Sequence, residues 1–271
     1  SNNVIAYGRR DLQHWRPADL DGDGDGDLVH LVAFGGGVTV EYLRARGDGT
    51  WSNGANSYLA GFSLPSVDDF LIADVSGDGL SDLIHVEATS PGGGGHIRTL
   101  LGNGDGQFTE RVQSSSVIGF RDMRRMRVAD LDGDGLADLV HVVSGGPIAQ
   151  LSGLRVAAYL SDGNGGWRPS DFSLVQNSWL AEEANLFEAG ALVRFLDVNG
   201  DGRDDLVCVS TYIDLAGQPR TALVVAAAPG PGQPWLWQVE KSLSFTSYDH
   251  DPWRWQTYRD PGTGDPGLLY V

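Results

Sequence analysis

The stretch V-A-D-L-D-G-D-G-L-A-D-L-V-H-V, from Val128 to Val142, places four aspartates and two glycines beside an apolar run. A short run of leucine and β-branched residues that follows glycine-rich turn residues is typical of a buried β-strand. Carboxylates held a few ångströms apart repel one another unless a cation lies among them. The stretch therefore predicts a cation-binding loop that leads into a strand.

The same stretch occurs in four copies. The others read A-D-L-D-G-D-G-D-G-D-L-V-H-L from Ala18, A-D-V-S-G-D-G-L-S-D-L-I-H-V from Ala73 and L-D-V-N-G-D-G-R-D-D-L-V-C-V from Leu196. A fifth copy, from Arg259, has lost nearly all of its acids. The regular spacing of the copies indicates a repeat protein. Their first aspartates are Asp19, Asp74, Asp130 and Asp197, at intervals of 55, 56 and 67 residues.

Each copy is followed by a second apolar run, a glycine turn and an aromatic residue. A unit thus reads as strand, acidic loop, strand, strand, glycine hairpin and strand, which predicts an all-β fold of four-stranded β-propeller blades. We expect one domain over residues 1–271, with repeats near 19–73, 74–129, 130–196 and 197–258, and a last one from 259–271 with 1–18. The only plausible helix lies between Asn177 and Gly190. The aromatic residues after the hairpins are predicted to pack inside the fold: Trp51, Phe108, Trp167 and Trp235.

The acidic loops share one pattern of oxygen-bearing side chains. We name them loop 1 (residues 19–27), loop 2 (74–82), loop 3 (130–138) and loop 4 (197–205). Oxygen ligands stand at positions 1, 3, 5 and 9 of each loop, and glycine stands at position 6. A hard cation with six to eight oxygen ligands fits this set, so we expect about four structural Ca²⁺ ions. The side chains assigned as ligands are Asp19, Asp21, Asp23, Asp27, Asp74, Ser76, Asp78, Asp82, Asp130, Asp132, Asp134, Asp138, Asp197, Asn199, Asp201 and Asp205.

An EF-hand begins in the same way, but it carries an acid at position 12 and is flanked by helices. Position 12 here is His30, His85, His141 or Cys208, and the flanks read as strands, so an EF-hand is rejected. The three histidines could line a shared surface or pack between blades. The apolar strands around them favour packing.

Composition excludes several classes of function. The net charge of -17 and the pI near 4.5 argue against nucleic acid or an anionic membrane as the main partner. No apolar run is long enough for a membrane-spanning helix, so no membrane insertion is expected. Cys208 is the single cysteine, which excludes a disulfide within the chain.

The loops resemble the calcium-binding FG-GAP or VCBS repeats, which occur in integrin α-chain propellers and in many bacterial and fungal proteins. The resemblance rests on D-x-D-x-D-G-x-x-D followed by an apolar strand, and it implies a β-propeller with Ca²⁺ loops between the first two strands of each blade. It also implies a ligand role for the backbone carbonyl at position 7, which belongs to Asp25, Leu80, Leu136 and Arg203. Five repeats are fewer than the family's usual seven. The chain is therefore either a small propeller or part of a larger one.

Three functions are open at this stage. The leading one is a secreted, extracellular binding module with lectin-like glycan recognition, in which Trp179, Trp253 and Trp255 are the candidate ligand-binding residues. The first alternative is a structural or protein-interaction segment of a larger secreted protein, such as a toxin-complex component, so the expected partner is a glycan or a protein ligand. The second is a polysaccharide-active enzyme. No catalytic motif supports it, so an enzyme is the less favoured reading.

Overall fold

The computed structural model describes residues 15–62, 70–88, 95–115, 126–144, 154–170, 173–176, 192–213, 219–230, 237–246, 255–259 and 266–270. All regular elements in these segments are β-strands, joined by turns and bends. Within them there is no helix of the length and apolarity that a membrane crossing requires. The helix expected between residues 177 and 190 falls outside the described segments, as do Trp179 and Trp253.

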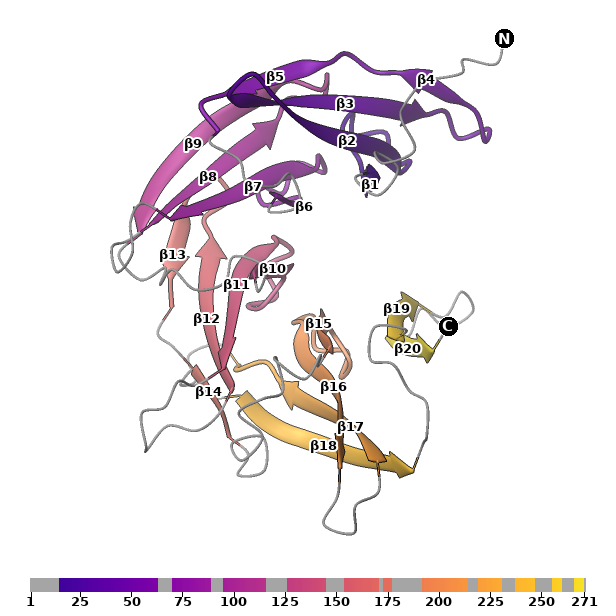
Figure 1. Cartoon of the computed structure of the whole chain (residues 1–271), viewed down its shortest axis with the longest axis vertical. Helices are drawn as coiled ribbons and strands as arrows, with labels where there is room; N and C mark the ends of the chain where they lie inside the picture. The colour runs from indigo at the N-terminus through magenta and orange to yellow at the C-terminus, as the bar shows by residue number, and fades with distance from the viewer. Residues whose placement is uncertain are drawn as a thin grey trace. The chain divides into compact units, whose positions relative to one another are not determined.

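The first repeat forms one antiparallel sheet in the order β1-β2-β3-β4, and β5 pairs with β3 (Figure 1). Loop 1 joins β1 to β2, and the pairing of Ala18 with Asp27 closes it. The strands are β1 (Trp15–Ala18), β2 (Asp27–Phe34), β3 (Gly37–Ala45), β4 (Trp51–Asn53) and β5 (Ser57–Ala60).

The second repeat forms a four-stranded antiparallel sheet in the order β6-β7-β8-β9. Loop 2 joins β6 to β7, and Ala73 pairs with Asp82 just as Ala18 pairs with Asp27. The strands are β6 (Phe70–Ala73), β7 (Asp82–Ala88), β8 (Gly95–Gly102) and β9 (Phe108–Ser115).

The third and fourth repeats share a nine-stranded sheet, because β14 of the third pairs in parallel with β18 of the fourth. Loop 3 joins β10 to β11, and loop 4 joins β15 to β16. The strands of the third repeat are β10 (Met126–Ala129), β11 (Asp138–Ser144), β12 (Leu154–Ser161), β13 (Trp167–Pro169) and β14 (Ser173–Gln176). Those of the fourth are β15 (Leu192–Leu196), β16 (Asp205–Ile213), β17 (Pro219–Ala227) and β18 (Trp237–Thr246).

The chain ends in a two-stranded antiparallel sheet of β19 (Trp255–Arg259) and β20 (Pro266–Tyr270). Trp255 lies in β19 opposite Tyr270, and the placement of its side chain is outside the described structure. These strands fall in the decayed fifth copy. Ring closure with the N-terminal residues stays a prediction, since residues 1–14 are not described.

The chain divides into two compact units, and each has its own apolar core. The first comprises residues 1–124 with 161–167, and the second comprises 125–160 with 168–271. In the first unit the sheets of repeats one and two bury a shared cluster that includes Val29, Val40, Phe70 and Leu83. In the second unit repeats three and four bury Leu131, Val140, Leu206 and Cys208. Such pairing of sheet faces is how the blades of a propeller pack.

The predicted fold class is confirmed. The described part of the chain is all-β, and the first three strands of each repeat pair in an antiparallel sheet, as they do in a propeller blade. Each acidic loop lies between the first two strands of its repeat. The expectation of a single domain stays a prediction.

Candidate metal centre

The first aspartate of each loop holds the loop backbone together. In loop 3 the Asp130 carboxylate accepts hydrogen bonds from the backbone N–H groups of Gly133 (2.8 Å) and Gly135 (2.9 Å). Both glycines have positive φ, 79° and 84°, which residues with a side chain rarely adopt. The same pair of bonds recurs at Asp19, Asp74 and Asp197. The sequence pattern predicts a role for the glycine at position 6, and the structure adds the same role for the glycine at position 4, which every copy carries.

The aspartate at position 9 ties each loop to its sheet. These four side chains, Asp27, Asp82, Asp138 and Asp205, are 0% exposed. In loop 2, Asp82 accepts hydrogen bonds from the backbone N–H groups of Val75 (2.9 Å) and Gly102 (2.8 Å). Burial raises the pKa of Asp82 to about 6, although both of these bonds oppose the shift. A position expected only as a metal ligand is therefore also a buried structural anchor.

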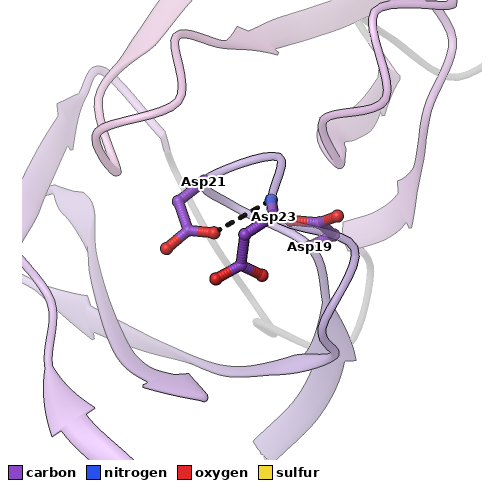
Figure 2. A group of neighbouring side chains, drawn as sticks. All are labelled: Asp19, Asp21 and Asp23. Carbon is purple, nitrogen blue, oxygen red and sulfur yellow. Dashed lines mark hydrogen bonds between the residues drawn. The ribbon is translucent and has the colours of Figure 1, made fainter. Parts of the chain in front are cut away.

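Three carboxylates converge in loop 1 and in loop 3. Asp19, Asp21 and Asp23 bring one oxygen each within 4.8 Å of the others, and so do Asp130, Asp132 and Asp138. Figure 2 shows the loop 1 group, in which the Asp23 N–H also donates to Asp21 Oδ1 at 3.3 Å. In loops 2 and 4, Ser76 and Asn199 stand at position 3, so a neutral oxygen replaces one carboxylate there.

The carboxylate at position 5 shapes the end of each loop. The oxygen Oδ1 of Asp23, Asp78, Asp134 or Asp201 accepts the backbone N–H two residues further on, at 2.9 Å in each case. The donor is the position 7 residue, Asp25, Leu80, Leu136 or Arg203. The role of its carbonyl as a ligand stays a prediction.

The electrostatics of the loops favour a bound cation. Burial raises the pKa of Asp132, and the neighbouring Asp134 carboxylate raises it further. The Oδ1 atom of Asp132 is buried and has no hydrogen-bond partner. Burial likewise raises the pKa of Asp21, although an Asp23 backbone bond and Arg44 oppose that shift. A cation among these groups would supply the missing partner and offset the repulsion.

Neighbouring loops within each unit are hydrogen-bonded to each other. In the first unit the Ser81 N–H donates to the Asp19 carbonyl at 2.6 Å, and the Asp19 N–H donates to Ser81 Oγ at 2.9 Å. In the second unit Asp204 and Asp130 make the equivalent two bonds. Ser81 and Asp204 both stand at position 8, which sequence reasoning did not single out. We name these contacts the loop bridges.

Two of the position 12 histidines pack against aromatic rings. The His30 ring stacks on Trp15 with the ring centroids 4.8 Å apart. The His85 ring lies 4.7 Å from Phe70 and 5.3 Å from Phe62, and burial lowers its pKa to about 4. All three histidines are buried, and for His30 and His85 the aromatic contacts agree with the packing role expected from the sequence.

The aromatic residues after the hairpins differ in burial. Trp167 is 3% exposed, and its indole N–H donates to Thr99 Oγ1 at 2.9 Å. Phe108 packs against the first core. Trp51 is 46% exposed, so the expectation that it packs inside the fold is wrong. The equivalent Trp167 is hydrogen-bonded to the second repeat, through its indole N–H to Thr99 and through its backbone N–H to Gln113.

The carboxylates Glu87 and Glu110, which lie outside the loops, surround a buried arginine. Arg98 pairs with Glu110 at 2.5 Å and with Glu87 at 3.3 Å, and its guanidinium lies 3.5 Å from the centre of the Phe62 ring. Arg98 also donates to the carbonyls of Ala60 and Gly61. This ion-paired cluster joins the first two repeats through the contacts of Arg98 with Ala60, Gly61 and Phe62.

Comparison with known families agrees with the repeat pattern. Residues 74–141 match the model of the FG-GAP-like repeat. The matched residues include loop 2, the rest of the second repeat, loop 3 and the start of β11. The predicted resemblance is thereby confirmed for these residues. No curated protein sequence matches the chain.

Among solved structures, the catalytic domain of the GH62 α-L-arabinofuranosidase of Coprinopsis cinerea is similar to this chain. The identity is 13% and the TM-score 0.38, over 96% of this chain and 82% of that one. Similarity at this level supports no conclusion about activity.

Proposed function

We propose that the chain is an extracellular binding module whose blades are stabilised by Ca²⁺ in the acidic loops. The observation that carries the proposal is the convergence of Asp130, Asp132 and Asp138, together with the buried and unpartnered Oδ1 atom of Asp132. Buried polar atoms nearly always have a partner, so an unpartnered carboxylate oxygen inside an acidic loop points to a ligand.

The donor set fits a hard cation. The side chains at positions 1, 3, 5 and 9 offer only carboxylate, amide or hydroxyl oxygens, which Ca²⁺ prefers over the nitrogen and sulfur ligands of transition metals. In each loop the oxygens already hydrogen-bonded to backbone N–H groups keep a second lone pair for a cation. The ion would supply positive charge between β-strands and fix the loop that joins them. Such sites suit the millimolar calcium found outside cells.

A glycan is the ligand that we propose for the module. Trp51 and Tyr58 are 46% and 51% exposed. Trp51 lies opposite Ala45 of β3, and Tyr58 lies opposite Thr39 of the same strand. Side chains alternate between the two faces along a strand, and residues 39 and 45 are separated by an even number of positions, so both aromatic side chains lie on one face of the first sheet. Exposed aromatic rings offer flat apolar surfaces with a polar edge, which suits stacking on sugar rings. Trp179, Trp253 and Trp255 remain proposed contacts as well.

Calcium binding is tested first by isothermal titration of the metal-free chain. We expect saturable uptake that Asp132→Asn weakens, whereas Asp105→Asn, at an exposed hairpin aspartate, leaves it unchanged. Absence of uptake by the folded wild-type chain would contradict the proposal.

Ligand recognition is tested on a glycan array, with Ca²⁺ and with chelator. Calcium-dependent binding to a defined sugar supports the lectin function and directs substitutions to the exposed tryptophans. If a folded, Ca²⁺-loaded chain binds no glycan on the array, the result would instead favour the alternative that the chain is a protein-interaction segment of a larger secreted protein.

A further inference from the structure

Loops 1 and 3 have the same acids at positions 1, 3, 5 and 9, yet their third residues have different partners. In loop 1 the side chain of Asp21 is 4% exposed, and its Oδ2 atom forms an ion pair with Nε of Arg44. The same guanidinium reaches Asp23 Oδ2 through Nη2 at 3.4 Å. Asp21 Oδ2 and the Oδ1 atom of the equivalent Asp132 in loop 3 are both buried without a hydrogen-bond partner, but of the two carboxylates only Asp21 has an ion-pair partner among the described residues. A positively charged side chain of the protein itself, the Arg44 guanidinium, therefore contacts two proposed metal ligands of loop 1.

Arg44 occupies a sheet position at which no other repeat has an arginine, although in loop 4 Arg203 pairs with Asp201 at 2.5 Å from within the loop itself. Arg44 comes from β3, one residue after Leu43, which pairs with Leu28 of β2. In the other repeats the residues that pair with the equivalent leucines are Leu100, Tyr159 and Ala226. The positions equivalent to Arg44 are therefore occupied by Leu101, Leu160 and Ala227, none of which carries a charge. The arginine is thus not part of the common blade design.

We propose that Arg44 is a built-in competitor of the cation in loop 1 and makes this loop a weaker Ca²⁺ site than loop 3. The inference rests on the proposed Ca²⁺ binding. A cation that uses Asp21 and Asp23 has to displace the guanidinium from both. Arginine cannot lose its charge, so it continues to repel a cation bound close by.

The competitor has the opposite effect when Ca²⁺ is absent. Arg44 then neutralises part of the negative charge of loop 1 through its ion pairs with Asp21 and Asp23. Loop 1 consequently keeps its shape better than loop 3 in metal-free solution. The two sites are therefore expected to fill at different calcium concentrations, loop 3 before loop 1.

Calcium titration of the full chain tests the competition, with Arg44→Gln as the variant. Its matched control is Arg46→Gln, which removes the same charge two residues further on, from an exposed arginine that forms no ion pair with loop 1 among the described residues. We expect one site of Arg44→Gln to bind Ca²⁺ roughly threefold to fivefold more tightly, the range expected for an exposed ion pair. Arg46→Gln should reproduce the wild-type isotherm.

The outcomes separate this inference from the proposed function. If wild-type chain binds Ca²⁺ and Arg44→Gln binds it no more tightly than Arg46→Gln does, the competitor is refuted and the proposed function stands. If the wild type binds no Ca²⁺, both fail.

A second measurement places the effect in loop 1 and does not depend on binding heats. In excess chelator, the melting temperature of Arg44→Gln should fall below that of Arg46→Gln, and in saturating Ca²⁺ this difference should shrink or reverse. With Asp21→Asn and Asp23→Asn combined in the background, Arg44→Gln should no longer change the affinity of the remaining sites. A change that persists there would show that Arg44 acts elsewhere and would overturn the proposal.

Discussion

The backbone N–H of Asp130 donates to the Asp204 carboxylate at 3.0 Å, and the Asp204 N–H donates back to the Asp130 carbonyl at 2.6 Å. The first residue of loop 3 is thereby fixed by the eighth residue of loop 4. Burial raises the pKa of Asp204, which is consistent with a carboxylate enclosed between two acidic loops.

We expect Asp204→Ala to destabilise the chain by about 1–3 kcal/mol, because the substitution leaves the Asp130 N–H without its acceptor. Asp204→Asn keeps an acceptor oxygen at the same place and should cost much less. Urea denaturation of the three proteins in excess chelator measures the difference without a contribution from metal binding. Equal stability of the alanine and asparagine variants would contradict the role of this bond.

Removal of calcium should lower the thermal stability of the chain. A ligand that binds only the folded state stabilises it by about 2.7 kcal/mol at a concentration one hundred times its dissociation constant. Calorimetric melting with Ca²⁺ and with excess chelator measures the shift, with Mg²⁺ as the control ion. A melting temperature that does not change in chelator would exclude a structural role for calcium.

Because His85 is buried, we expect the folded chain to lose stability in acid. Burial lowers its pKa to about 4, compared with 6.5 for a free histidine, and the Arg98 charge lowers it further. The proton therefore binds better to the unfolded chain. The stability contributed by neutral His85 is fully present above pH 6.5 and is lost as the pH falls through about 4.

The matching substitution is His85→Phe, which suits the neighbouring Phe62 and Phe70 rings. Over the pH range from 7 to 4, wild type should lose up to about 3 kcal/mol relative to this variant. The free energy of unfolding in urea, measured at each pH for both proteins, gives the difference. Parallel pH profiles would show that His85 does not titrate as its burial implies.

The equivalent tryptophans Trp51 and Trp167 should respond differently to the same substitution. Trp167→Phe removes a buried hydrogen bond to Thr99 and some buried ring surface, and it should cost about 1–2 kcal/mol. Trp51→Phe changes an exposed side chain and should stay within about 0.5 kcal/mol of wild type. Denaturation of both variants in the same buffer tests the pair. If the two costs were alike, the difference in burial would have no energetic consequence.

The repeat pattern was sufficient to predict four strands in each repeat and the positions of the acidic loops, but it did not predict the fifth strands, β5 and β14, of the first and third repeats. The alternation of acids and glycines located all four loops between antiparallel strands, and position 9 falls on the first residue of β2, β7, β11 and β16. Local spacing carries this information because both turn geometry and strand pairing depend on neighbouring residues.

Contacts between distant residues could not be predicted in the same way. Arg44 reaches loop 1 from a different strand, and Ser81 reaches Asp19 from the next repeat. Trp51 and Trp167 occupy equivalent positions in sequence and differ in burial, and the hydrogen bonds of Trp167 go to Thr99 and Gln113 of the second repeat. These features depend on which sheet lies next to which, and a repeat pattern that treats all units alike contains no such information.

The loop bridges restrict how a chain of this kind can grow by gene duplication. The eighth residue of loops 2 and 4 is matched to the first residue of the loop before it, whereas loops 1 and 3 carry Gly26 and Ala137 there, without a side-chain acceptor. A single copied unit would bring an unmatched residue to its new neighbour. Copying two adjacent units together would preserve the bridge, whereas copying one unit would not.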